Sequence, residues 1–164
     1  MMTSNSVNLR PAAPDDESFL RKVFASTRID EFKFLADQSQ LDALINMQFN
    51  FQRQQYEAAY PHAEHNIILH DDQPIGHLFV DEGDREFTLV DIALLPEWRN
   101  AGIGRLLIEQ LLTRATAVGK AVRLHVSKSN PARRLYERLG FAINGEDGMY
   151  FEMVCPPETR KRKE

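Results

Sequence analysis

Apolar side chains in the first sixty residues follow the spacing of one strand and two helices. The short alternating run at residues 7–10, which Pro11 closes, predicts a strand. Residues 17–27 predict a helix, because acidic residues stand at its start and its apolar positions fall on one face. A broad apolar stripe predicts a second helix from about residue 39 to residue 60, ended by Pro61. That stripe consists of Leu41, Leu44, Ile45, Phe49, Tyr56 and Tyr60.

The remaining residues alternate between strand-like and helix-like patterns. In chain order, the predicted elements are strands 66–70, 75–81 and 86–96, a helix at 105–118, a strand at 121–127, a helix at 130–140, and strands 141–144 and 150–155. Short turns join the three consecutive strands between residue 66 and the helix at 105–118, which predicts an antiparallel meander. Gly119 ends the longer helix, and Asn130 caps the shorter one, with Pro131 at its first position. With a final hairpin through residues 145–148, the elements predict a mixed α+β fold.

Composition indicates one globular domain in a reducing compartment. The chain has 164 residues, 43% of them apolar and 27% charged, which is typical of a single domain with a buried core. Its net charge of -4 leaves no basic surplus to neutralise phosphates, so no nucleic-acid partner is expected, and the basic tail at 156–164 is predicted to be flexible. A single cysteine, Cys155, provides no disulfide framework and fits the cytoplasm.

Other classes of segment and site are not expected either. No signal peptide and no apolar run long enough to cross a membrane are recognisable, so neither secretion nor a membrane partner is predicted. The histidines form no metal-binding pattern, so no metal is expected. His62 and His65, which are three residues apart, are instead expected to be surface histidines.

The hexapeptide Arg99–Gly104, Arg-Asn-Ala-Gly-Ile-Gly, lies between a predicted strand and a predicted helix. Glycines permit a close approach to the backbone, and the N–H groups at a helix start attract anions. A P-loop is excluded, because it needs Gly-Lys-Ser/Thr and Arg105 follows Gly104 here. A dinucleotide fingerprint is excluded by Leu107, which stands where a small residue is needed. By itself, the hexapeptide fits either an anion site or a tight strand-to-helix turn.

A second motif, Asn-Pro-Ala-Arg-Arg-Leu-Tyr-Glu-Arg-Leu-Gly-Phe at residues 130–141, follows the next predicted strand. Together with Arg-x-x-Gly-x-Gly at 99–104, it resembles the GNAT N-acetyltransferase superfamily, over residues 65–155 by sequence and over the first 60 by the layout of elements. The resemblance implies a single GNAT-like domain over 1–164, with a central, splayed, mostly antiparallel sheet of about seven strands and four helices. It also implies an N-acetyltransferase that uses acetyl-CoA as acyl donor.

In this superfamily, the loop at the helix start binds the pyrophosphate of acetyl-CoA through main-chain N–H groups, and the preceding strand pairs with the pantetheine arm. The implied cofactor-binding positions are Ile92, Ala93, Leu94, Arg99, Asn100, Ala101, Gly102, Ile103, Gly104, Arg105, Asn130 and Tyr136. The Ile92 N–H would donate a hydrogen bond to the thioester carbonyl and stabilise the developing oxyanion. Asn130 would contact the pantetheine and cap its helix; it stands six residues before Tyr136, one fewer than the common spacing.

Tyr136 matches the tyrosine that usually lies near the CoA sulfur in this superfamily. A phenol has a pKa of about 10 and a thiol one of about 8.5, so complete proton transfer to the thiolate is uphill by roughly 2 kcal/mol. We therefore expect Tyr136 chiefly to donate a hydrogen bond to the departing sulfur, with proton delivery secondary. The base that removes the amine proton stays open. His125 matches a strand position where some relatives carry a catalytic glutamate, and Asp91, Glu31 and a water chain are the alternatives.

The first two helices and their connection build acceptor specificity in this superfamily. Glu31, Phe32 and Phe34 are accordingly expected to line the acceptor site, whereas the aromatics of the second helix are expected in the core. Those aromatics are Phe49, Phe51, Tyr56 and Tyr60. Three functions stay open: acetylation of a small amine or amino acid, acetylation of a protein N-terminus or lysine, and acyl-CoA binding without catalysis. The acceptor, the preferred acyl group and the oligomeric state, with a homodimer among the alternatives, are not determined by sequence.

Overall fold

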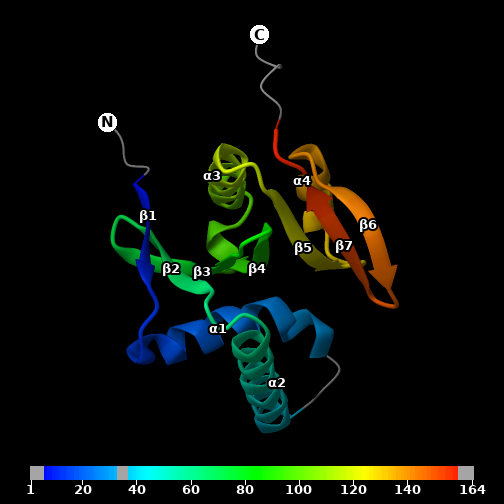
Figure 1. Cartoon of the computed structure of the whole chain (residues 1–164). Helices are drawn as coiled ribbons and strands as arrows, with labels where there is room; N and C mark the ends of the chain where they lie inside the picture. The colour runs from blue at the N-terminus through cyan, green and yellow to red at the C-terminus, as the bar shows by residue number, and fades with distance from the viewer. Residues whose placement is uncertain (1–5, 33–36, 159–164) are drawn as a thin grey trace. The chain divides into compact units, whose positions relative to one another are not determined.

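A computed structural model describes residues 6–32 and 37–158 (Figure 1). Within that part of the chain, seven strands and four α-helices follow one another. They are β1 Val7–Pro11, α1 Glu17–Arg28, α2 Gln38–Ala59, β2 Glu64–His70, β3 Gln73–Glu82, β4 Glu86–Leu94, α3 Ile103–Ala117, β5 Ala121–Ser127, α4 Ala132–Arg138, β6 Ala142–Asp147 and β7 Tyr150–Cys155. Short 3-10 helices occupy Pro14–Asp16 (η1), Ile29–Phe32 (η2) and Pro96–Trp98 (η3).

The described strands form one sheet in the order β1-β2-β3-β4-β5-β7-β6. Strand β1 pairs with β2, and β5 and β6 each pair with β7, all in antiparallel register. Strands β4 and β5 run parallel, and their pairing covers Glu86 to Leu89. The predicted mixed α+β fold, with a mostly antiparallel sheet, is therefore confirmed for the described residues.

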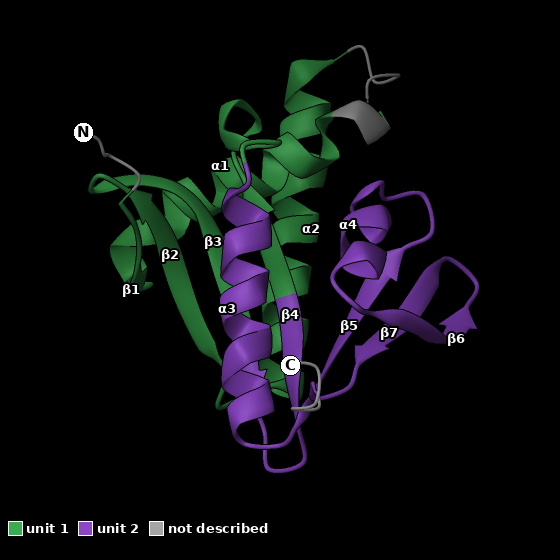
Figure 2. Cartoon of the chain, turned by 90° about the horizontal axis from the view of Figure 1, so that it is seen from above, with its two compact units in different colours: residues 1–79, 91–101 green, residues 80–90, 102–164 purple. Residues whose placement is uncertain are grey.

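The chain divides into two compact units, which Figure 2 colours separately: residues 1–79 with 91–101, and residues 80–90 with 102–164. In unit 1, helices α1 and α2 turn their apolar faces toward a shared core that includes β2. Its buried members are Leu20, Phe24, Leu41, Ile45, Phe49 and Ile67. The rings of Phe24 and Phe49 meet edge to face, with centroids 5.7 Å apart. Such an arrangement contributes beyond the area that the two rings bury.

In unit 2, helix α3 packs against strand β5. Helix α3 buries one apolar stripe, made of Ile103, Leu107, Ile108, Leu111 and Ala115. Strand β5 buries alternate residues, namely Val122, Leu124 and Val126. Because successive strand residues point to opposite faces, the intervening Arg123 and His125 lie on the other face of β5. Figure 2 shows β5, β7 and β6 of this unit as neighbouring strands.

The prediction that the four aromatics of the second helix lie in the core is wrong for Phe51, and the fourth of them, Tyr60, follows the last residue of α2. Phe49 is 4% exposed, whereas Phe51 is 60% exposed. Two residues separated by two positions on an α-helix lie about 200° apart, so they cannot share one buried face. Tyr56 follows the prediction more closely, since its ring meets that of Phe79 edge to face at 5.5 Å between centroids.

The final hairpin also differs from its prediction. Strand β6 continues to Asp147, so residues 145–147, which were expected to form the turn, belong to the strand. The pairing of β6 with β7 shifts between Ile143 and Gly145, as at a β-bulge, which lets the strand pass the glycine. The reversal occurs instead at Gly148, whose φ of +46° is a left-handed conformation that suits glycine.

Two further findings concern the ends of the chain and membranes. Among the described helices, none combines the length and the apolar character needed to cross a bilayer. Of the predicted tail at 156–164, residues 159–164 lie outside the described residues. The backbone N–H of Glu158 donates a hydrogen bond to the Thr116 hydroxyl at 3.0 Å, so the first part of this segment is attached to α3.

Asp16 should make the stability of unit 1 depend on pH under acidic conditions. Both its oxygens accept hydrogen bonds from Arg10, at 2.8 and 2.9 Å, and this contact lowers the pKa of Asp16 from 3.8 to about 2. A lowered folded-state pKa means that the stabilisation is present above about pH 4 and is lost as the pH falls toward 2. Because Arg10 is partly exposed, we expect Asp16→Asn to cost about 1 kcal/mol at pH 6.

Urea unfolding of the wild type and of Asp16→Asn, at pH 6, 4 and 2.5, measures this effect. The difference in free energy of unfolding between the two proteins should shrink as the pH falls. A difference that stays constant down to pH 2.5 would show that the Arg10–Asp16 contact does not set this pH dependence.

Candidate functional site

Residues 99–102 form a strained turn directly before helix α3, and Ile103 and Gly104 are the first two residues of that helix. Asn100 and Gly102 adopt positive φ values of 59° and 87°, which are left-handed conformations. Only glycine adopts this conformation without strain, which explains Gly102. Arg99 is fixed at the start of the turn, because its Nε donates to the Leu94 carbonyl at 2.9 Å and its Nη2 donates to the Ser26 hydroxyl at 3.1 Å.

The start of α3 presents bare main chain. The first hydrogen bond within the helix runs from the Leu106 N–H to the Gly102 carbonyl at 3.0 Å, so the preceding N–H groups have no partner within the helix itself. A Cβ built on Gly102 or on Gly104 would meet no described atom within 4 Å. Both glycines therefore border open space, and both stand at the end of α3 that carries the positive end of the helix dipole. These features fit the binding of an anionic group such as a pyrophosphate.

The strand segment that precedes this turn packs very closely against β3. A Cβ on Gly76 would lie 2.2 Å from the Ala93 carbonyl oxygen and 3.0 Å from the Leu94 Cα. The Leu95 N–H also donates to the Ile75 carbonyl at 2.8 Å. The backbone of Ala93 and Leu94, two of the predicted cofactor-binding positions, is thus held in place by a neighbouring strand that has no side chain at this point.

A chain of three polar side chains in unit 1 was not found from the sequence. The Nε2 atom of His77 lies 3.0 Å from the Asp91 Oδ2 atom, and the Nδ1 atom of His77 lies 2.9 Å from the His65 Nε2 atom. The prediction of His65 as a surface histidine is wrong, because its ring is stacked on Phe79 with centroids 4.7 Å apart. The residues lie on three neighbouring strands, so only the register of the sheet could have shown that they meet.

Burial and neighbouring charges keep Asp91 charged and His65 neutral within this group of three polar side chains. Burial alone would raise the pKa of Asp91, but the His77 hydrogen bond, the nearby charges of His77 and Arg28, and a hydrogen bond from the Ile92 N–H lower it below its usual value. Burial, followed by the positive charges of His77 and Arg53, lowers the pKa of His65 to about 4. At neutral pH, Asp91 is therefore a carboxylate and His65 carries no charge.

The second predicted motif lies in unit 2. Tyr136 is 8% exposed, and its ring meets that of Phe141 edge to face at 5.8 Å between centroids. The Asn130 side-chain oxygen accepts a hydrogen bond from the Ala132 N–H at 2.9 Å, so Asn130 satisfies one N–H group at the start of α4, although Pro131 occupies the cap position itself. Helix α4 itself begins at Ala132, slightly later than predicted.

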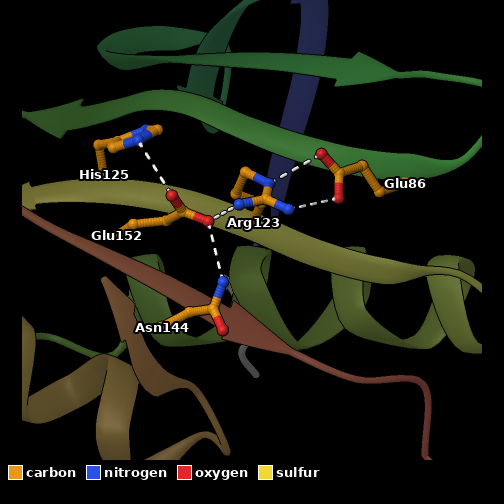
Figure 3. Close-up of polar contacts among 5 residues, drawn as sticks. All are labelled: Glu86, Arg123, His125, Asn144 and Glu152. Atoms are coloured by element: carbon orange, nitrogen blue, oxygen red, sulfur yellow. Dashed lines mark hydrogen bonds and ion pairs between the residues drawn. The ribbon is translucent and has the colours of Figure 1, made fainter. Parts of the chain in front are cut away.

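His125 belongs to a polar network on β4, β5, β6 and β7, drawn in Figure 3. Arg123 stands at its centre, with hydrogen bonds to both oxygens of Glu86 at 2.8 and 3.1 Å and an ion pair with Glu152. The Nε2 atom of His125 lies 4.0 Å from Glu152, and the side chain is 49% exposed. His125 is accordingly accessible to solvent beside a carboxylate that Arg123 already pairs.

The three predicted acceptor-site residues are only partly described. Phe32 is partly buried and packs against the core cluster of unit 1. Phe34 lies outside the described residues, as does the side chain of Glu31. Their role at an acceptor site stays a prediction.

A cavity of about 680 Å³ lies in unit 2 beside α3. Its walls include the basic residues Arg105, Lys120 and Arg138, together with the carboxylates of Glu109 and Glu158. Arg105 donates a hydrogen bond to Glu109 at 3.1 Å, which offsets part of its charge. Cys155 also lines the cavity, but burial followed by the charge of Glu158 raises the pKa of its thiol, so it stays protonated and unreactive.

The acetyltransferase (GNAT) family model matches residues 29–141, more than half of the chain. Cysteine-rich protein 2-binding protein of Mus musculus is 54% identical over 88 residues, which are 54% of this chain and 11% of that protein. A ribosomal protein bS18-alanine N-acetyltransferase of Haemophilus influenzae is 36% identical over 75 residues, which are 45% of this chain and 51% of that protein. The chain thus spans about half of the second relative and much less of the first.

A likeness among solved structures extends over nearly the whole chain. The crystal structure of PaiA N-acetyltransferase from Thermoplasma acidophilum, in complex with coenzyme A, has a TM-score of 0.69 and covers 92% of this chain and 99% of that chain. Because the two sequences are 18% identical, this likeness shows the fold alone. The fold expected from the two sequence motifs is therefore confirmed.

Proposed function

Because the chain belongs to the acetyltransferase (GNAT) family, we propose that it is an acetyl-CoA-dependent N-acetyltransferase acting on a primary amine of a small molecule or an amino acid. The amine attacks the thioester directly while both substrates are bound. The observation that carries this proposal is the bare main chain at the start of α3, where Gly102 and Gly104 border open space beside N–H groups that the helix does not use.

The residues of the turn and of β4 have separate parts in this proposal. The main chain of Asn100 to Arg105 holds the pyrophosphate, and Arg99 keeps the start of the turn in place. The segment Ile92–Leu94 pairs with the pantetheine arm, and the Ile92 N–H donates to the thioester carbonyl. Because this N–H also donates to the Asp91 carboxylate, the thioester carbonyl has to share the donor.

Tyr136 donates a hydrogen bond to the departing sulfur, and Asn130 contacts the pantetheine. Replacing Tyr136 by phenylalanine should lower kcat by about 10- to 100-fold, as expected for the loss of a hydrogen bond to a charged group. The affinity for acetyl-CoA should change little, since the ring and its contact with Phe141 remain. Single-turnover rates and calorimetric titration with coenzyme A measure both quantities, and an unchanged kcat would remove Tyr136 from the mechanism.

The amine proton has to leave before or during attack, because most amines arrive protonated at neutral pH. His125 is the proposed base, since it is accessible to solvent. A water chain and Asp91 are the alternatives, and Glu31 is a further one. Glu31, Phe32 and Phe34 are proposed to contact the acceptor.

A panel of amines with acetyl-CoA tests the proposed function. Release of free thiol and a mass increase of the acceptor by one acetyl group would support it. Coenzyme A binding without turnover of any amine would instead indicate an acyl-CoA-binding domain without catalysis. Absence of coenzyme A binding would contradict the assignment of the turn.

Acetylation of a protein N-terminus is the second candidate function. It is favoured by the 36% identity to an enzyme whose name gives ribosomal protein bS18 as its substrate. Peptides with free N-termini therefore belong in the panel, beside small amines and amino acids. A cytoplasmic location is proposed from the single cysteine, and size measurements in solution decide between a monomer and a homodimer.

A further inference from the structure

The side chains of Asp91, His77 and His65 form a continuous chain of polar contacts. Asp91, at one end of it, directly precedes Ile92 in the sequence. We propose that the Asp91 carboxylate binds the ammonium group of the acceptor, and that His77 and His65 are positioning residues that hold this carboxylate in place. The inference rests on the proposed function and deepens it. It specifies acceptors that bind as protonated primary amines, and it assigns a task to two histidines that the transfer reaction otherwise leaves unused.

The Asp91 carboxylate retains the capacity to bind a ligand. Its side chain is 31% exposed, whereas that of His77 is 13% exposed, so Asp91 is more accessible to solvent than the histidine that holds it. A carboxylate offers about four acceptor positions. The hydrogen bonds from His77 and from the Ile92 N–H use two of them. The remaining positions can accept N–H groups of an ammonium ion, next to the residue proposed to bind the thioester carbonyl.

The two histidines restrict how the carboxylate can move. His77 uses both ring nitrogens, one toward Asp91 at 3.0 Å and one toward His65 at 2.9 Å. Its ring therefore cannot rotate without losing a hydrogen bond. The ring of His65 is fixed in turn, because it lies nearly parallel to Phe79, with an angle of 10° between the planes. A carboxylate held in this way loses little conformational entropy when it binds an amine.

Neighbouring charged side chains act on both ends of the Asp91–His77–His65 group, in which Asp91 is the anion. Arg28 at the end of α1 acts on Asp91, while Arg53 on α2 and Asp16 on η1 act on His65. The Arg28 guanidinium lies over the Phe24 ring, 4.7 Å from its centroid, and adds a positive charge near Asp91. Long-range attraction for a cation is thereby weakened, so recognition has to come from direct hydrogen bonds to the carboxylate.

Substitution of Asp91 by asparagine separates charge from shape. The probes are the best alkyl amine of the panel and the alcohol of the same carbon skeleton, used as a competitive inhibitor that carries no charge. In Asp91→Asn, the KM for the amine should rise by about 10- to 100-fold, since a hydrogen bond to a charged group is lost. The inhibition constant of the alcohol and the KM for acetyl-CoA should stay near their wild-type values. Asp84→Asn, on an exposed loop, is the matched control.

Substitution of His77 tests positioning. His77→Phe removes the donor to Asp91 and should raise the KM for the amine by about tenfold, with a smaller effect on kcat. His77→Gln places an amide N–H where Nε2 stood, so it should restore most of the lost affinity. A purely structural role would lower the thermal stability of both variants without this difference between phenylalanine and glutamine. His62→Gln, at an exposed histidine, serves as control.

The outcomes distinguish this inference from the proposed function. Turnover of amines by the wild type, combined with unchanged discrimination between amine and alcohol in Asp91→Asn, would overturn the inference and leave the proposed function intact. Coenzyme A binding without turnover of any amine by the wild type would overturn both. Loss of discrimination in Asp91→Asn, with rescue by His77→Gln, would establish the ammonium site.

Discussion

Replacing Gly104 by valine should weaken coenzyme A binding by at least about 100-fold while leaving the protein folded. The valine side chain would enter the space that borders Gly104, in which the structure describes no atom within 4 Å. Hydrogen bonds to a charged group contribute about 1.5–3 kcal/mol each, so losing one or two of them accounts for this factor. The free energy of unfolding should change little, because nothing is displaced and valine is a better helix former than glycine.

Titration calorimetry with coenzyme A and urea unfolding measure the two quantities for Gly104→Val. Gly145→Val is the matched control, because a Cβ on Gly145 likewise meets no described atom within 4 Å and this residue lies on β6, away from the turn in the sequence. Normal coenzyme A binding by a folded Gly104→Val protein would mean that the turn does not hold the pyrophosphate.

Replacing Gly76 by alanine should lower the free energy of unfolding by about 3 kcal/mol. The added methyl group would lie 2.2 Å from the Ala93 carbonyl oxygen, and its neighbour there is backbone, which cannot turn aside as a flexible side chain does. Overpacking of this kind typically costs 1–3 kcal/mol and sometimes more. Because the displaced segment includes Ala93 and Leu94, the affinity for coenzyme A should fall as well.

Urea unfolding and coenzyme A titration of Gly76→Ala check both parts, with Gly145→Ala as the control in a strand. A stability within about 0.5 kcal/mol of the wild type would show that β3 and β4 separate easily at this point. A stable variant with weakened coenzyme A binding would show that the added methyl group disturbs the β4 segment proposed to bind the pantetheine arm, without disturbing folding.

Local sequence patterns were sufficient for most elements of the fold. Helix α2 was predicted from about residue 39 to residue 60 and occupies Gln38–Ala59, because its apolar spacing and Pro61 are local signals. Strand β5 was predicted with its correct bounds, since its alternation is strict. Prediction was wrong where local signals conflicted: the glycines of the last hairpin indicated a turn at 145–148, but pairing with β7 continues β6 to Asp147.

Some features of the candidate site could likewise be predicted from local sequence, and others could not. The two glycines at the start of α3 and the Asn130 hydrogen bond at the start of α4 are local features, because backbone conformation and helix capping are decided by a few consecutive residues. The Asp91–His77–His65 chain joins residues on three strands, and the exclusion of a side chain at Gly76 depends on a strand that lies elsewhere in the sequence. No local pattern contains either relation.

The sequence by itself therefore determined the order of the elements, the bare turn at Gly102 and Gly104, and the family to which the two motifs belong. The tertiary structure decided which side chains meet across the sheet and which remain exposed, as with His65 and Phe51. The physical reason is that helix and turn signals act over a few residues, whereas contacts between strands depend on register, which the packing of the whole sheet fixes.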